Sequence, residues 1–172
     1  DDKPMRKFIS LCLIWVPLLW LAGCTPEYNW REQSVAEERA VVTFPARTKT
    51  EQRKIEVEGL SLTFSLTSAA VGDAVFSVGY AALDDSVSAA QAKSLVSAFV
   101  RALSRRVGQN TPDQATSGEL FTFESDLNGK PSLLMGRVLV HRGMLIQVVV
   151  SGPAKSLSRE NASEFMRSLV LR

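Results

Sequence analysis

The chain has 172 residues, of which 20 are Lys or Arg and 18 are Asp or Glu, so its formal net charge is +2. Hydrophobic residues make up 45% and charged residues 22%, as in ordinary globular domains, which excludes a disordered, collagen-like or nucleic-acid-wrapping protein. Two cysteines and one histidine exclude a disulfide framework and a Cys/His zinc site. We expect one domain.

The first 23 residues have the pattern of an export signal. Met5-Arg6-Lys7 is typical of an initiator and a basic region, so residues 1–4 are interpreted as a vector scar or a misassigned start. The uncharged run over residues 8–21 reaches roughly 21 Å as a helix, which is shorter than the ~30 Å hydrocarbon core of a bilayer. Residues 5–23 are therefore predicted to be a signal peptide and not a transmembrane helix.

Leu21-Ala22-Gly23-Cys24 resembles the lipobox of bacterial lipoproteins. The resemblance implies cleavage before Cys24, a diacylglycerol on its sulfur and usually a third acyl chain on its amino group. Each buried CH₂ gains about 0.8 kcal/mol, so such chains hold a protein on a bilayer almost permanently. Thr25 stands where an aspartate would favour inner-membrane retention in enteric bacteria, so we expect the outer membrane, facing the periplasm. The alternative is an ordinary secretory signal with an incidental cysteine.

Removing the leader leaves basic and acidic residues nearly balanced, which gives no electrostatic reason to expect a nucleic-acid partner. Residues 24–38 are polar and lack a sustained apolar period. They are predicted to comprise the lipidated Cys24 and a tether that holds the domain off the membrane. Tyr28 and Trp30 either dock on the domain or sit near lipid headgroups, and docking is the preferred interpretation. Residues 39–172 are predicted to form a single globular domain.

Apolar residues that alternate with polar ones predict strands in the domain. The clearest case is the run from Leu60 to Ser68, which is typical of a sheet with one buried face. Asn128-Gly129 favours a hairpin turn, because both residues tolerate positive φ. The predicted strands cover residues 40–44, 54–58, 60–68, 74–83, 119–125, 132–141 and 144–151, and residues 169–171 are an extended end along the sheet.

Two helices are predicted. Ser88 and Gln91 fit a capping box, apolar residues follow at steps of three and four, and Gly108 suits the C-terminal end. A second helix covers about residues 158–168, with four apolar residues on one face: Ala162, Phe165, Met166 and Leu169. This order, made of hairpins without crossovers, predicts an α+β domain whose central antiparallel sheet of about six to seven strands is flanked by two main helices.

In the order of its predicted elements, the chain resembles the PsbP/Mog1-like domains, which include bacterial envelope lipoproteins of the DcrB type. The resemblance spans roughly residues 39–172 and rests on element order with short signatures: Phe44-Pro45, Gly79-Tyr80-Ala81, residues 128–131, Ser151-Gly152-Pro153 and Phe165–Leu169. It implies an α/β/α sandwich and, for most bacterial members, a non-catalytic envelope role. Shared fold does not carry function across, and the resemblance offers no catalytic or metal-binding positions to transfer.

Few residues in the sequence suggest catalysis or the binding of a metal ion or nucleotide. The sequence has no EF-hand loop, Walker A, G-x-G-x-x-G or H-E-x-x-H motif. His141 is the only imidazole, and we interpret it as a solvated residue at a hairpin end. Glu124 and Asp126 lie two apart on one strand face and are interpreted as a solvated strand end. Asp84 and Asp85 lie before the first helix, where its dipole favours negative charge.

Two other groups of residues suggest binding surfaces. Arg101, Arg105 and Arg106 complement the end of the first helix, or form a basic patch for anionic headgroups if the fold adds Arg142 or Arg167. A curved sheet under a helix can enclose an apolar cavity, although aromatic residues at such spacing are usually core. The residues that would line it are Phe64, Phe76, Phe99, Phe121 and Phe123.

The sequence therefore predicts a non-enzymatic, lipid-anchored periplasmic lipoprotein that acts through protein contacts in envelope assembly or maintenance. It has no catalytic, cofactor-binding or metal-binding residue in this hypothesis, and its only attached group is the lipid on Cys24. The alternative is a carrier of a lipid or another apolar ligand, and a third hypothesis is a hydrolase that uses His141 with a serine. The partner and the oligomeric state stay open.

Overall fold

The computed structural model describes residues 27–110 and 115–172, so the predicted leader and Cys24 lie outside the described residues. The strands and helices follow one another in this order: β1 (Arg31–Val35), β2 (Ala40–Phe44), β3 (Lys49–Val57), β4 (Leu60–Val71), β5 (Ala74–Ala82), α1 (Ala89–Arg106), β6 (Phe121–Leu127), β7 (Lys130–His141), β8 (Met144–Pro153), α2 (Arg159–Arg167) and β9 (Val170–Leu171).

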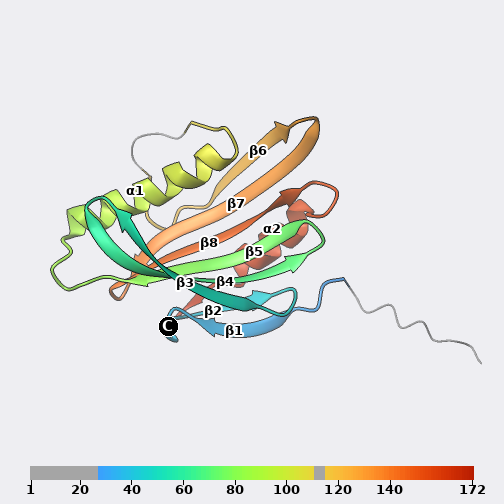
Figure 1. Ribbon diagram of the computed structural model, residues 1–172. Coiled ribbons are helices and arrows are strands. Elements are labelled where there is room, and N and C mark those ends of the chain that lie inside the picture. Colours follow the sequence, from blue (N-terminus) through green and yellow to red (C-terminus); the bar gives the residue numbers. More distant parts are fainter. Residues whose placement is uncertain (1–26, 111–114) are drawn as a thin grey trace, which may run out of the picture.

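The fold is α+β, as the sequence predicts, and its centre is a six-stranded antiparallel sheet in the order β3-β4-β5-β8-β7-β6 (Figure 1). The strands are joined mainly by tight hairpins, which keep each strand next to its neighbour in the chain. The long connection through α1 carries the chain to the opposite edge, where β6 begins. A second, three-stranded sheet in the order β1-β2-β9 was not anticipated from the sequence.

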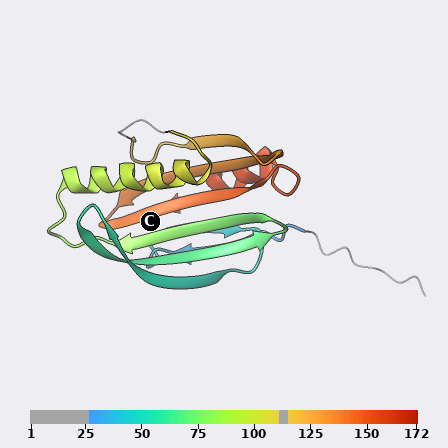
Figure 2. The same ribbon diagram turned by 45° about the horizontal axis from the view of Figure 1, so that its top comes forward.

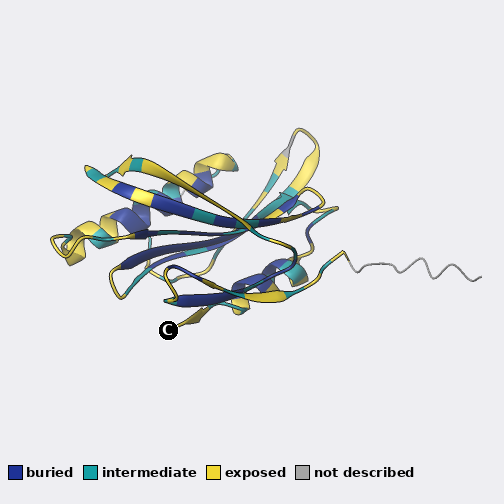
Figure 3. Ribbon diagram, turned by 60° about the horizontal axis from the view of Figure 1, so that its bottom comes forward, coloured by how far each residue is buried: buried dark blue, intermediate teal, exposed yellow. Residues whose placement is uncertain are grey.

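The two faces of the large sheet are covered differently (Figure 2). On one face lies α1, and the residues buried beneath it include Leu62, Phe64 and Leu95. On the other face lie α2 and the small sheet, and they bury a second cluster that includes Phe44, Phe76 and Phe165. Figure 3 shows the buried residues concentrated in the central strands and on the inner sides of both helices. The fold therefore has three layers with a core on each side of the sheet.

The capping signals in the sequence locate α1 correctly. The Ser88 hydroxyl accepts a hydrogen bond from the Gln91 amide at 3.1 Å, and the Gln91 side chain accepts one from the Ser88 amide at 2.9 Å. These two bonds satisfy amide donors that have no partner within the helix. Gly108, with φ of +69°, follows the end of α1 and confirms the predicted stop.

The prediction of a tether up to residue 38 is wrong for its second half. Residues 31–35 form β1, which pairs with β2 in the register Arg31 to Phe44 through Val35 to Ala40. The sequence pattern does not indicate this strand, because β1 lies at the edge of the small sheet and only Val35 in it is buried. Tyr28 and Trp30 pack against the buried cluster on the α2 face, which confirms that they dock on the domain.

Several strands are longer than predicted. β3 begins at Lys49 and not at residue 54. Its first residues are all polar, since an edge strand can expose both faces, so the sequence pattern did not mark them as part of a strand. β4 continues to Val71, where the sequence predicted an end at residue 68. β8 continues through Gly152 to Pro153, which pairs with Ser132 of β7, although Gly-Pro was expected to stop it at residue 151.

The end of the described chain belongs to the small sheet. Val170 and Leu171 form β9 and pair with Val41 and Ala40 of β2, so this segment extends the small sheet and not the large one. The Ser168 hydroxyl accepts a hydrogen bond from the Thr43 amide at 3.0 Å, which ties the end of α2 to β2. Within the part of the chain that the structure describes, no helix has the length and hydrophobicity required to span a membrane.

Candidate functional site

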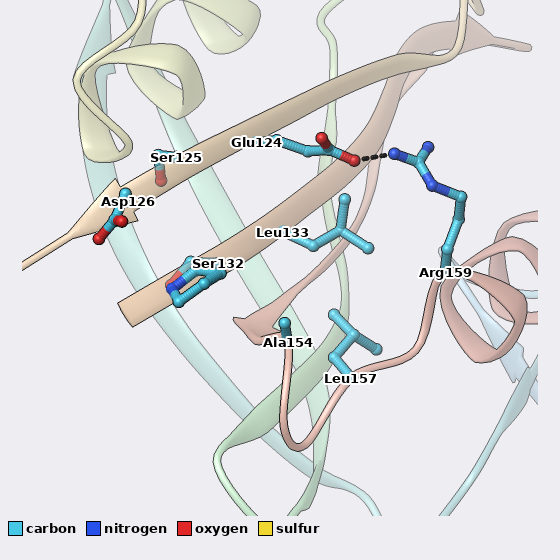
Figure 4. Close-up of a pocket in the computed structure, with 9 residues that line it drawn as sticks. Glu124, Ser125, Asp126, Ser132, Leu133, Ala154, Leu157 and Arg159 are labelled. Atoms are coloured by element: carbon cyan, nitrogen blue, oxygen red, sulfur yellow. Dashed lines mark ion pairs between the residues drawn. The ribbon is translucent and has the colours of Figure 1, made fainter. Parts of the chain in front are cut away.

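A hollow of about 440 Å³ opens where the β6–β7 hairpin approaches the start of α2, and we call it the β6–α2 pocket (Figure 4). Leu133 and Leu157 provide its buried apolar surface. The Glu124 carboxylate and the Arg159 guanidinium form an ion pair across it. The lining residues come from β6, β7, the β8–α2 loop and α2: Glu124, Ser125, Asp126, Pro131, Ser132, Leu133, Ala154, Leu157 and Arg159.

Strand alternation and a helix cap bring this ion pair together. Glu124 lies opposite Leu133 in the β6–β7 register, on the face of the sheet that α2 covers. The Ser158 hydroxyl accepts a hydrogen bond from the Asn161 amide at 3.0 Å, which starts α2 and places Arg159 as its first residue. Both charged side chains are more than 60% exposed, so solvent screens the pair and its contribution to stability is about 1 kcal/mol or less.

The interpretation of Glu124 and Asp126 as a solvated strand end agrees with the structure, since both residues are exposed. Arg159 partners Glu124, so the two carboxylates are not equivalent. The Ser125 hydroxyl next to them is buried and has no hydrogen-bond partner among the described residues. The pocket thus combines a carboxylate–guanidinium pair, a second carboxylate and an apolar wall.

The structure does not bring His141 to this pocket. His141 ends β7, eight residues beyond Leu133, so it lies about 26 Å from the pocket at 3.3 Å per residue. Its Nε2 atom lies 2.8 Å from the backbone oxygen of Arg172, which can only accept, so this bond requires the tautomer that carries the hydrogen on Nε2. The Arg172 amide in turn donates to the Arg39 carbonyl at 2.8 Å. The imidazole therefore helps to hold the end of the chain against β2.

Asp84 has a local structural role besides the one predicted from the helix dipole. Its carboxylate accepts a hydrogen bond from the Ser86 amide at 2.9 Å, and that bond lowers the pKa of Asp84 below 3.8. The first turn of α1 contains no acidic residue. Asp84 therefore stabilises the turn that leads into α1.

The arginines considered for a basic patch do not gather. Arg101 forms an ion pair with Glu58 at 3.5 Å. Arg142 lies in the β7–β8 turn near the start of α1, whereas Arg106 ends this helix, which is about 27 Å long at 1.5 Å per residue. Arg167 belongs to α2 on the opposite face of the sheet and pairs with Glu164.

The five phenylalanines proposed for one apolar cavity lie on two faces of the sheet. Phe64 and Phe99 pack together with ring centroids 5.7 Å apart under α1, and Phe121 and Phe123 pack against the same cluster. Phe76 lies on the other face, 5.2 Å from Phe165. The central sheet separates Phe76 from the other four, so the grouping in a single cavity is wrong.

A second hollow, of about 580 Å³, lies beside the first half of α1. Its lining is mostly small and apolar, with one lysine: Ala89, Ala92, Lys93, Val96, Ala115, Thr116, Ser117 and Val140. This hollow was not predicted, because Ala115 and Val140 come from segments whose approach to α1 depends on the tertiary fold. We call it the α1 hollow.

Residues 27–110 and 115–172 contain no group of three or more His, Cys, Asp or Glu side chains that is arranged to hold a metal ion. Cys24, the predicted lipid attachment site, lies outside the described residues. No protein-family model matches this chain, and no curated protein matches it either.

Proposed function

We propose that this protein is a lipid-anchored lipoprotein of the bacterial envelope, held in the outer membrane, and that it acts as a non-enzymatic interaction module in the periplasm. The observation that carries the proposal is the sequence Leu21–Cys24, which directly follows a basic region and a short apolar run.

The placement of the reactive side chains favours a role in binding. His141 and Glu124 lie near opposite ends of β7, about 26 Å apart by the strand rise, and each contacts a structural partner, the Arg172 backbone and the Arg159 side chain. Acid–base catalysis requires such groups within hydrogen-bond reach of one substrate. These positions do not meet that requirement.

The sheet edge offers a surface for a protein partner. β3 ends the large sheet and pairs with β4 alone, so its outer backbone groups face away from the sheet. Edge strands of this kind accept a further strand from another protein. β3 carries side chains of both charges, with Lys49 paired to Glu51, and such charges on an edge strand discourage indiscriminate pairing.

Metabolic labelling with a fatty-acid analogue tests the anchor. Wild-type protein should incorporate the label and float with outer-membrane vesicles, and Cys24→Ser should lose both properties. Cys12→Ser is the matched control, since Cys12 lies within the predicted leader, and it should label like the wild type. Labelling that persists in Cys24→Ser would overturn the proposed attachment.

In-cell photocrosslinking tests the interaction role. A crosslinker at Lys54 on β3 should capture one recurrent envelope protein, whereas a crosslinker at exposed Glu164 on α2 should not. Removal of Cys24 should weaken the capture, because the anchor concentrates the domain at the membrane. Substrate turnover by the purified domain would contradict a non-enzymatic role.

A second candidate function is carriage of an apolar ligand, and the α1 hollow is the observation that favours it. Native mass spectrometry of protein extracted from membranes provides the test. A co-purifying lipid that is lost in Ala92→Phe, which fills the hollow, would support carriage. Protein that is free of ligand in both forms would exclude it.

A further inference from the structure

Three segments that are far apart in sequence meet where the described chain begins, and we call this place the proximal end. The Tyr28 hydroxyl donates to the Ser156 carbonyl at 3.1 Å. The Lys155 ammonium lies 3.7 Å from the Asp73 carboxylate. The proximal end comprises residues 27–28, the β4–β5 turn at Gly72 and Asp73, and the β8–α2 loop at Lys155 and Ser156.

The first described residues are fixed to the core by aromatic packing. The Tyr28 and Trp30 rings stack with centroids 5.7 Å apart. Both rings meet the edge of Phe76, at 6.0 and 6.1 Å, and Phe76 is fully buried. Aromatic pairs at such distances contribute about 0.5–1.5 kcal/mol each beyond the area that they bury. Tyr28 and Trp30 are therefore held at a fixed place on the domain, and the chain enters the fold there.

Covalent geometry limits the distance from this point to the predicted anchor. Three peptide units join Cys24 to Glu27, and they span about 11 Å at most. Acyl chains on Cys24 would be buried in the hydrocarbon core, which holds that residue at the membrane interface. This step rests on the proposed lipidation, and it follows that the proximal end stays within the headgroup region.

We propose that the proximal end of the domain lies against the phospholipid headgroups and that the strands lead away from the bilayer. β4 runs from the β3–β4 turn to the proximal end, and its twelve residues span about 36 Å at 3.3 Å per step. The β3–β4 and β7–β8 turns lie at the opposite, distal end together with the start of α1 (Figure 1). The distal end and the sheet edges are thus the surfaces that are presented to periplasmic proteins.

The charges at the proximal end indicate that the linker, and not electrostatic attraction, sets this orientation. Glu27 and Asp73 are acidic and Lys155 is basic, so the described part of this end has a net charge of −1. Anionic lipids would not attract such a surface. The orientation should therefore be the same on zwitterionic and anionic vesicles and should not change with salt.

Fluorescence quenching by headgroup nitroxides tests this orientation. Ala70→Cys and Ser61→Cys place a single labelling site near either end of β4, and both positions are exposed. They are nine residues apart, or roughly 30 Å along the strand. In the lipidated protein on phosphatidylcholine vesicles that carry a nitroxide on the headgroup, a dye at position 70 should be quenched at least threefold more strongly than a dye at position 61.

A longer linker provides the matched control. Twenty Gly and Ser residues inserted after Thr25 would extend the linker by a root-mean-square distance of about 25 Å. This insertion should bring the two quenching values close together. Equal quenching at both positions with the natural linker, or stronger quenching at position 61, would overturn the orientation. Protein that fails to float with the vesicles would instead refute the lipid anchor, so the two failures are distinguishable.

Discussion

Gly79 is a position where one added methyl group should be costly, because a buried aromatic ring packs against it. Gly79 lies in β5, opposite Leu66 and Gln147, and its backbone does not have the positive φ that disfavours alanine. A Cβ atom built on Gly79 would lie 3.0 Å from both Cε atoms of the Phe64 ring and closer still to its Cζ. Phe64 is 5% exposed, so its ring has little room to move.

We expect Gly79→Ala to lower the free energy of unfolding by about 1–2 kcal/mol. Overpacking of a core costs about 1–3 kcal/mol, and the lower entropy of the unfolded chain after Gly→Ala offsets about 0.4–1 kcal/mol of this. Phe64→Leu removes the ring, so in that background Gly79→Ala should be neutral or slightly stabilising. Urea titration followed by the fluorescence of Trp30, the only tryptophan after the predicted leader, measures both changes. Equal destabilisation in the two backgrounds would refute the steric argument.

Three further predictions concern a cap, a titration and an ion pair. Ser88→Ala should lower the free energy of unfolding by about 1 kcal/mol, whereas Ser94→Ala on the exposed side of α1 should change it little. Burial raises the pKa of Tyr28 above 10.0, so the Tyr28 hydroxyl loses its proton at a lower pH in the unfolded chain than in the folded one. The free energy of unfolding should therefore fall as the pH rises through 10, and Tyr28→Phe should reduce this fall. Glu124→Gln and Arg159→Gln should each cost about 1 kcal/mol or less, and a loss above about 2 kcal/mol would show that the pair is shielded from solvent.

Local signals in the sequence were sufficient for most of the large sheet and for both helices. The alternation from Leu60 to Ser68 reflects one buried face, and β4 includes that run. The Asn128-Gly129 turn adopts positive φ at both residues, as the pair favours. The capping box at Ser88 depends only on neighbouring residues. Each of these features is determined within a short stretch of chain, so tertiary context did not change it.

Only β2 of the small sheet could be predicted, because the signals for its other two strands are not local. The β1–β2 turn at Ala36, Glu37 and Glu38 has positive φ at all three residues, without the glycine or asparagine that would mark such a turn. β1 is mostly exposed, and β9 has only two residues. These strands form because β2 is held against the buried cluster by Phe44 and Phe165, whose ring centroids are 5.4 Å apart.

In the candidate site, too, the features set by nearby residues could be predicted and the contacts between distant residues could not. The sequence predicted that Glu124 and Asp126 share a strand face, but it could not show that Arg159, 35 residues further along the chain, reaches Glu124. The placement of Phe76 on the face opposite Phe64 follows from the register of β4 and β5. Strand register depends on pairing between distant residues, so composition and periodicity do not determine it.

Intact-mass spectrometry of the protein extracted from the membrane of its native producer tests whether Cys24 carries the lipid anchor. We expect a chain that begins at Cys24, with a mass increased by a diacylglycerol and, in the triacylated form, by one further acyl chain. An unmodified Cys24, or a chain that still carries residues 5–23, would contradict the anchor and the membrane orientation derived from it.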